Sequence, residues 1–246
     1  MEKIYFVMPT YNESENIEDS IREWYTVIEK INTEYDVEAH LVIADDGSKD
    51  DTFEKMQALS ASGLYPSFTP LTKENGGHGQ TLLFLYQYAL DNGADYVFQT
   101  DSDGQTKSED FWQLFDNRHQ YDFLIGHRKS RQDGFARILV THTLRLIVRL
   151  IFKTWVTDAN APFRLMQRDR LQSIMDIIPS NYFLCNVAIS AIAKKWGYRV
   201  AFYPITFKPR QGGINSMNLL RIMKIGFKAL SDFRTINAMS GKSPAN

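Results

Sequence analysis

The chain has 246 residues, a formal net charge of −1 and a hydrophobic content of 43%. These values are typical of a globular protein with a substantial core, and they provide no basic field that would attract nucleic acid. The single cysteine, Cys185, excludes an intrachain disulfide framework. The apolar N-terminal run is too short for a signal peptide, and no stretch reaches the ~18 apolar residues of a membrane span. We therefore expect a cytoplasmic protein without a nucleic-acid partner.

Alternation of apolar runs with amphipathic segments predicts the fold. Short apolar runs that fit buried strands occur at residues 4–8, 40–44 and 67–72 and again from residue 96. Helices are expected between them: one capped by Ser14, one starting at Asp50 or Asp51, and one over about 81–92. This order predicts an α/β fold with a mostly parallel central sheet and helices on both faces.

Each predicted strand is followed by a polar segment, and we expect these segments to meet. They are residues 10–13, 45–48, 75–80 and 101–105. Because ligands bind at the carboxyl ends of the strands in open α/β sheets, these segments predict a site along one edge. Any one of them alone could equally be a turn that caps a helix. The chain lacks the dinucleotide fingerprint and the P-loop motif, which argues against a dehydrogenase or a kinase.

The fourth of these segments has the character of a divalent cation site. It carries two carboxylates, Asp101 and Asp103, followed by Gly104 and the amide of Gln105. The glycine allows the chain to turn, so that both acidic side chains can approach one ion. Hard oxygen ligands of this kind suit Mg²⁺ or Mn²⁺, which are commonly held by one or two carboxylates together with substrate phosphates. The alternative is an acidic turn in which Asp101 caps a helix.

These motifs resemble those of a known enzyme family. Residues 9–13 (Pro-Thr-Tyr-Asn-Glu), 45–48 (Asp-Asp-Gly-Ser) and 101–103 (Asp-Ser-Asp) are similar in order and spacing to family 2 glycosyltransferases of the GT-A fold. Gln105 and the later segments 126–128, 158–164 and 204–213 resemble the dolichol-phosphate mannosyltransferase and polyprenyl-phosphate glycosyltransferase group. The resemblance implies a GT-A domain over residues 1–215, followed by a C-terminal amphipathic helix and tail over 216–246.

The resemblance also implies roles for individual residues. Those expected to bind substrate are Pro9, Tyr11, Glu13, Asp45, Gly79, Arg128, Arg137, Thr141 and Arg164. Those expected to take part in catalysis are Asp101, Asp103, Asp158 and Arg210, and the expected Mg²⁺ or Mn²⁺ ligands are Asp103 and Gln105. His78 stands where relatives often have a lysine or arginine, and we interpret it as a loop histidine without a ligand.

The expected reaction is metal-dependent, inverting transfer of a sugar from a nucleotide diphosphate, GDP-mannose or a UDP-sugar, to a polyprenyl or dolichyl phosphate. Many relatives carry an acidic residue near position 183, whereas residues 182–187 contain no carboxylate here. A phosphate acceptor is largely ionised at neutral pH and needs no strong base, although Asp158 could serve as one. The alternatives are transfer to a glycan hydroxyl in surface polysaccharide assembly and a non-catalytic sugar-nucleotide-binding subunit.

A basic helix predicted over residues 134–153 indicates a further partner. Polar or basic residues recur every four positions along it, at Arg137, Thr141, Arg145, Arg149 and Lys153, beside apolar residues. Such a helix can lie on an anionic membrane surface or hold a lipid phosphate, or it can be a core helix with a basic solvent face. Residues 219–233 repeat the pattern. We therefore expect peripheral contact with the inner face of the membrane and, because relatives often carry transmembrane helices, a separate membrane subunit.

Overall fold

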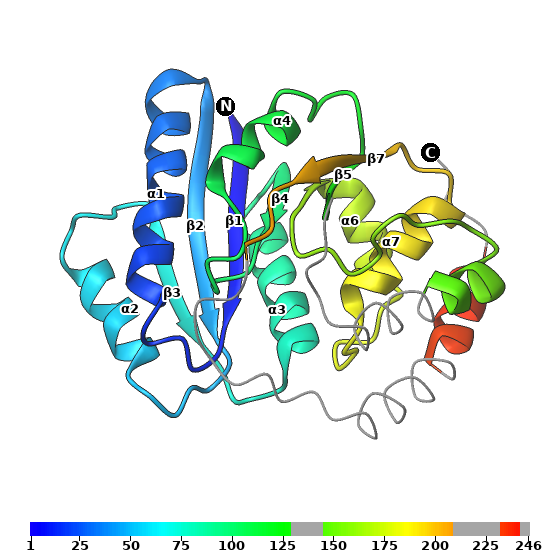
Figure 1. Ribbon diagram of the computed structural model, residues 1–246, viewed down its shortest axis with the longest axis horizontal. Helices are drawn as coiled ribbons and strands as arrows, with labels where there is room; N and C mark the ends of the chain where they lie inside the picture. The colour runs from blue at the N-terminus through cyan, green and yellow to red at the C-terminus, as the bar shows by residue number, and fades with distance from the viewer. Residues whose placement is uncertain (129–144, 209–231, 242–246) are drawn as a thin grey trace.

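The computed structural model describes residues 1–128, 145–208 and 232–241. This part of the chain forms a seven-stranded sheet in the order β3-β2-β1-β4-β6-β5-β7 (Figure 1). The strands are β1 (Glu2–Thr10), β2 (Val37–Asp45), β3 (Phe68–Thr72), β4 (Tyr96–Gln99), β5 (Phe123–Arg128), β6 (Arg164–Gln167) and β7 (Val200–Ile205). The predicted α/β class is confirmed.

The first four strands are parallel, as the sequence predicted. Their register places Thr10 opposite Asp45 and Val7 opposite Gln99, so the polar segments that follow β1, β2 and β4 leave the same edge of the sheet. β6 is antiparallel to both β4 and β5, while β5 and β7 pair in parallel. The antiparallel strand was not predicted, because its four residues carry no periodic signal of their own.

Helices cover both faces of the sheet. One apolar core lies under α1 (Ile17–Glu34), α2 (Thr52–Ala61) and α4 (Phe111–Phe115), and a short 3₁₀ helix η1 (Ser108–Asp110) leads into α4. The other lies under α3 (His78–Asp91), α6 (Arg168–Met175) and α7 (Cys185–Lys195). Strand alternation divides β1 between them, with Ile4, Phe6 and Met8 in the first core and Tyr5 and Val7 in the second.

Helix starts differ slightly from the predictions. Asn16 rather than Ser14 precedes α1, while Asp51 precedes α2 as expected. α3 begins at His78, three positions before the predicted start, and Gly77 precedes it with a φ of 85°. The earlier start brings the first turn of α3 to the edge where the polar segments meet.

The described part of the C-terminal region packs into the second core. The fully buried ring of Phe233 lies 5.8 Å from that of Phe152, centroid to centroid. Lys195 Nζ donates to Asn237 O at 3.0 Å and to Ser240 Oγ at 2.7 Å, which holds helical residues 232–239 on the end of α7. The proposed boundary between residues 215 and 216 lies outside the described residues. Within the described ranges, no helix has the length and hydropathy needed to cross a bilayer.

Candidate functional site

A pocket of about 380 Å³ opens where the four polar segments meet. Each segment contributes to its wall, so the predicted convergence is confirmed. The lining residues are Thr10, Tyr11 and Glu13 from the first segment with Pro9 just before it, Asp46 from the second, Asn75, Gly77 and His78 from the third with Thr81 just after it, and Asp101, Ser102 and Asp103 from the fourth.

Hydrogen bonds fix the backbone of the acidic segment. Ser102 Oγ donates to Pro9 O at 3.1 Å, and Ser20 Oγ of α1 donates to Ser102 O at 2.7 Å. Gly104 adopts a φ of 67°, the left-handed conformation that the expected turn requires. Asp101 does not cap a helix, because η1 begins only at Ser108 after Lys107. The segment therefore presents both carboxylates to the pocket.

Asp101 is a partly buried acid, with its side chain 25% exposed, whose charge is incompletely compensated. Burial raises the pKa of Asp101 to about 7, although the positive charges of Arg128 and Arg164 oppose the shift. Its Oδ1 atom is buried and accepts no hydrogen bond from any described residue, and His78 Nε2 lies 4.0 Å away. A buried oxygen without a donor fits a cation site, because a positive ion would compensate the charge that burial disfavours.

The carboxylates in this wall would form only part of a coordination shell. Across residues 1–128, 145–208 and 232–241, no three His, Cys, Asp or Glu side chains gather into a complete cage. Mg²⁺ and Mn²⁺ do not require one, since such ions often take the rest of their ligands from substrate phosphates and water. The oxygen donors present therefore fit a divalent cation that binds together with a phosphorylated substrate.

Asp46, rather than the expected Asp45, lines the pocket. Asp45 is 2% exposed, and its carboxylate accepts hydrogen bonds from Ser48 N and Thr72 Oγ1, both at 3.1 Å. Asp46 accepts from Lys73 Nζ at 2.6 Å and from the backbone N–H groups of Gly76 and Gly77 at 2.9 and 2.7 Å.

These bonds decide the charge of Asp46. Burial alone would raise the pKa of Asp46, but the bonds from Lys73 and the glycine loop outweigh it and hold the pKa below its usual range. Asp46 therefore remains a carboxylate that anchors the loop before α3.

Gly79 serves close packing rather than the pocket wall. A Cβ atom at this position would lie 2.3 Å from Phe183 O and 2.5 Å from Phe183 Cα. Only glycine allows the first turn of α3 to approach the backbone of the segment before α7 so closely. Gly79 is not among the residues that line the pocket, and its expected substrate contact stays a prediction; in the structure it sets the distance between the first turn of α3 and Phe183.

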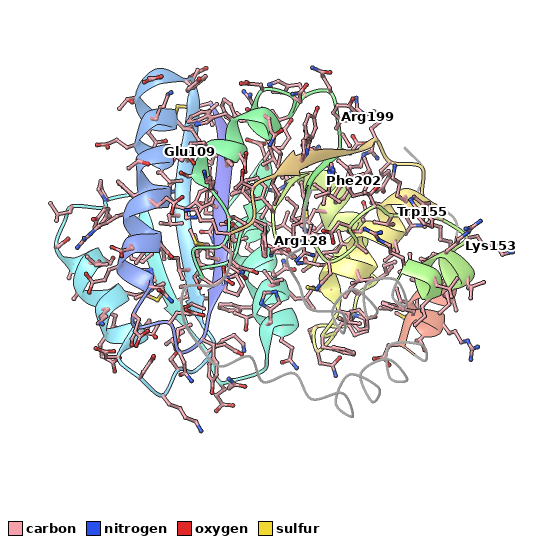
Figure 2. The ribbon with its side chains drawn as sticks, viewed as in Figure 1. Glu109, Arg128, Lys153, Trp155, Arg199 and Phe202 are labelled. Carbon is pink, nitrogen blue, oxygen red and sulfur yellow. The ribbon has the colours of Figure 1, made fainter. Side chains whose placement is uncertain are left out.

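Arg128 and Asp158 form a two-point ion pair beside the pocket. Arg128 Nε and Nη2 donate to the two carboxylate oxygens at 3.0 and 3.1 Å, and both side chains are largely buried, at 13% and 5% exposure. Arg128 also lies over the ring of Phe207, 5.0 Å from its centroid (Figure 2 labels Arg128 in the middle of the molecule). A carboxylate held in this way is stabilised in its charged form and is a weak proton acceptor.

Arg164 lies beneath the site and does not line it. Its side chain is fully buried, and its guanidinium donates to Ala161 O at 2.6 Å and to Asn186 O at 3.1 Å. Further donors reach Ser190 Oγ and Ala159 O. In the structure the hydrogen bonds of Arg164 hold the loop before β6 against α7, and its expected contact with substrate stays a prediction.

Gln105 lies at the far end of the acidic segment. Its Nε2 donates to Lys208 O at 3.0 Å, and Lys208 N donates back to Gln105 O at 2.7 Å. These bonds orient the side-chain amide, and its Oε1 atom is the one available for a metal. Three other expected site residues, Arg137, Thr141 and Arg210, lie outside the described residues.

Comparison with known proteins decides the family. Residues 5–190 match the profile of glycosyl transferase family 2. The chain belongs to this family. It is 24% identical over 229 residues to a polyprenol monophosphomannose synthase of Mycolicibacterium smegmatis, covering 90% of this chain and 83% of the relative. It is also 24% identical over 223 residues to an undecaprenyl-phosphate mannosyltransferase of Micrococcus luteus, covering 88% of each.

Solved structures with the same fold are also found. Glucosyl-3-phosphoglycerate synthase of Mycobacterium tuberculosis, in complex with Mn²⁺, UDP-glucose and glycerol 3-phosphate, has a TM-score of 0.66 and 16% identity. The match covers 99% of this chain and 82% of that chain. Mannosyl-3-phosphoglycerate synthase of Rubrobacter xylanophilus has a TM-score of 0.63 at 16% identity, covering 94% and 73%. The GT-A fold predicted from the sequence is therefore confirmed, and the match to the family model confirms the predicted enzyme class.

Three residues that line the pocket are not among the predicted site residues. His78, which the sequence predicts to be a loop histidine without a ligand, is the first residue of α3, and its Nε2 atom lies 4.0 Å from Asp101 Oδ1. The other two are Asp46, next to the predicted Asp45, and Thr81, for which the sequence predicts only a helix. A signal for Asp46 did exist, because the glycines at 76 and 77 supply free backbone donors that need an acceptor.

Proposed function

We propose that this glycosyltransferase moves a sugar from a nucleotide diphosphate to a polyprenyl phosphate with inversion at the sugar carbon. An acceptor phosphate oxygen attacks the anomeric carbon while the bond from that carbon to the diphosphate oxygen breaks. The products are a polyprenyl phosphosugar and a nucleoside diphosphate. The two curated relatives described above carry names of this class, one a polyprenol and one an undecaprenyl-phosphate enzyme.

The observation that carries the choice of acceptor is the engagement of Asp158 by Arg128. A hydroxyl acceptor needs a general base, and a carboxylate held at two points by a guanidinium is a poor one. Residues 182–187 supply no alternative base, because they contain no carboxylate and Asn186 of α7 offers only an amide that is 3% exposed. An acceptor phosphate, with its second pKa near 6, is already largely ionised at neutral pH.

The pocket is assigned to the nucleotide sugar. Pro9, Tyr11 and Glu13 form its first wall, and Asp101 and Asp103 face them. We assign Asp103 and the Oε1 atom of Gln105 as ligands of Mg²⁺ or Mn²⁺, with Asp101 in support. The cation, when bound, would stabilise negative charge on the departing diphosphate. Arg137, Thr141 and Arg210 remain predicted phosphate contacts.

The acceptor side is assigned to a membrane surface. A groove of about 430 Å³ lies between helical residues 145–152 and 232–239 and is lined mainly by apolar side chains. Leu146 and Leu150 on its rim are 56% and 69% exposed, and Trp155 is 56% exposed. Figure 2 shows Lys153 and Trp155 at the outer edge beside these helices. Exposed apolar residues next to cations favour an anionic lipid surface, such as the one that carries a polyprenyl phosphate.

One experiment tests the proposed function. The protein is incubated with Mn²⁺ and a panel of UDP- and GDP-sugars, with and without undecaprenyl phosphate, and labelled sugar is followed into the organic phase. The proposal requires lipid-dependent transfer that Asp103→Ala abolishes. Transfer only to a glycan in the aqueous phase would overturn the acceptor, and unchanged transfer by Asp103→Ala would overturn the metal site. Asp158→Asn is expected to keep transfer to the lipid phosphate, because no base is needed.

A further inference from the structure

A chain of buried polar side chains runs beneath the pocket and connects three elements. Tyr86 of α3 donates from Oη to Gln99 Oε1 of β4 at 2.8 Å. The same hydroxyl lies 2.9 Å from the Oδ1 atom assigned to Asn186 of α7. Tyr86 and Gln99 are fully buried, and Asn186 is 3% exposed. Buried polar groups are costly unless they are paired, so this cluster must be held in one arrangement.

The hydroxyl hydrogen can be donated to only one of the two amides. Since the oxygen and nitrogen of an amide are assigned from its hydrogen bonds, one of the two must present its NH₂ group to Tyr86. In the first arrangement, Gln99 Nε2 donates to Tyr86 Oη and Gln99 Oε1 points away from Tyr86. In the second arrangement, Asn186 Nδ2 donates to Tyr86 Oη, Gln99 Oε1 accepts from Tyr86, and Gln99 Nε2 points away.

The Asp101 carboxylate decides between these two arrangements. Gln99 Nε2 and Asp101 Oδ1 are both buried, and among the described residues neither has a hydrogen-bond partner. Gln99 ends β4, and Thr100 N still donates to Val7 O of β1 at 3.2 Å, so the chain stays extended and the side chains of Gln99 and Asp101, two residues apart, leave it on the same side. A nitrogen donor facing Asp101 is favourable, whereas an oxygen would repel it. Asn186 therefore donates to Tyr86, Tyr86 to Gln99, and Gln99 points its NH₂ group at Asp101.

We propose that Tyr86 is a positioning residue of the donor site, whose hydroxyl holds the Gln99 amide in the orientation that fixes the Asp101 carboxylate. The inference rests on the proposed function, in which Asp101 supports the cation and the diphosphate. Tyr86 itself touches neither. Loss of its hydroxyl frees the Gln99 amide to rotate, and an amide oxygen turned toward Asp101 displaces the carboxylate from its place in the pocket wall.

The test measures binding of UDP and GDP in the presence of Mn²⁺ by calorimetry. Tyr86→Phe keeps the ring and removes only the hydroxyl, and it is expected to raise the dissociation constant about tenfold. Gln99→Met removes the amide at similar size and should have a similar effect, which provides a second variant if one of the two folds poorly. In an Asp101→Ala background, adding Tyr86→Phe should change the dissociation constant by less than about twofold.

Tyr25→Phe is the matched control for a general loss of stability. Tyr25 is also a buried tyrosine, and its Oη accepts a hydrogen bond from Ser67 N at 3.1 Å in the other core. It should lower the melting temperature without changing nucleotide binding. Equal weakening by Tyr25→Phe, no weakening by Tyr86→Phe, or a full Tyr86→Phe effect in the Asp101→Ala background would each overturn the inference alone. Failure of the unmodified protein to bind either nucleotide would instead overturn the proposed function.

Discussion

Arg128 and Asp158 approach each other at two points, Nε to Oδ2 at 3.0 Å and Nη2 to Oδ1 at 3.1 Å. The pair joins the last residue of β5 to the loop that leads into β6. A bidentate guanidinium–carboxylate contact fixes both position and direction, and little water reaches it at 13% and 5% side-chain exposure. The ion pair therefore holds two opposite charges at fixed positions beside the pocket in the absence of substrate.

Removing one partner of this ion pair should destabilise the protein more than removing both. Arg128→Ala leaves the buried Asp158 carboxylate without its guanidinium and is expected to lower the free energy of unfolding by about 3–5 kcal/mol. The double variant Arg128→Ala/Asp158→Ala should be more stable than Arg128→Ala alone, because it leaves no uncompensated charge. Urea denaturation of the four proteins in the cycle measures both values. A double variant as unstable as the sum of the single changes would show that the two side chains act independently.

Gly79→Ala should destabilise the protein although it places alanine in a helix. Within an ordinary helix this change is worth about 1 kcal/mol in favour of alanine. Here the new methyl group would lie 2.3 Å from Phe183 O, and we expect a net loss of about 1–3 kcal/mol. Gly76→Ala is the control, because the closest atom to its methyl group is the flexible end of Gln80. Thermal melts should show a larger loss for Gly79→Ala than for Gly76→Ala.

Asp46→Asn should weaken the glycine loop in a pH-dependent manner. The pKa of Asp46 is lowered in the folded protein, so its charge adds stability above the ordinary value of 3.8, and this contribution is lost as the pH falls through the lower folded value. Asparagine carries no such charge. The difference in unfolding free energy between wild type and Asp46→Asn should thus be largest at neutral pH, at about 1.5–3 kcal/mol, and shrink in acid. A difference that stays constant from neutral pH to about pH 3 would contradict this account.

Exposed leucines at the groove should contribute to lipid binding. Leu146→Ser/Leu150→Ser removes two apolar side chains at 56% and 69% exposure, and we expect at least about a tenfold loss of affinity for vesicles that contain anionic lipid. Leu64→Ser is the control, since Leu64 is 71% exposed but follows α2 at the opposite end of the molecule (Figure 1). Vesicle co-sedimentation at two salt concentrations measures the effect. Equal losses for the two variants would argue against a specific surface.

The sequence by itself determined the parallel half of the sheet, the edge at which the site lies and the family. Each of these signals is local in the sequence, because a buried strand appears as a short apolar run and the polar segment that follows it is adjacent along the chain. Asp101–Gly104 alone allowed two interpretations, a cation site or a helix cap, and the polar segments after the other predicted strands favoured the cation site.

Only the tertiary structure decided which side chains line the pocket. Asp45 and Asp46 are adjacent in the sequence, yet side chains at a strand end alternate in direction, so one caps a turn and the other lines the pocket. The sequence indicates a substrate-binding role for Arg164, but it does not record the carbonyl groups of Ala161 and Asn186 that accept hydrogen bonds from its guanidinium in the fold. Tyr86 has the pattern of a core residue, and it is indeed buried. The hydrogen bonds of Tyr86 with Gln99 and Asn186 form because α3, β4 and α7 pack together. The periodicity of the sequence does not predict them.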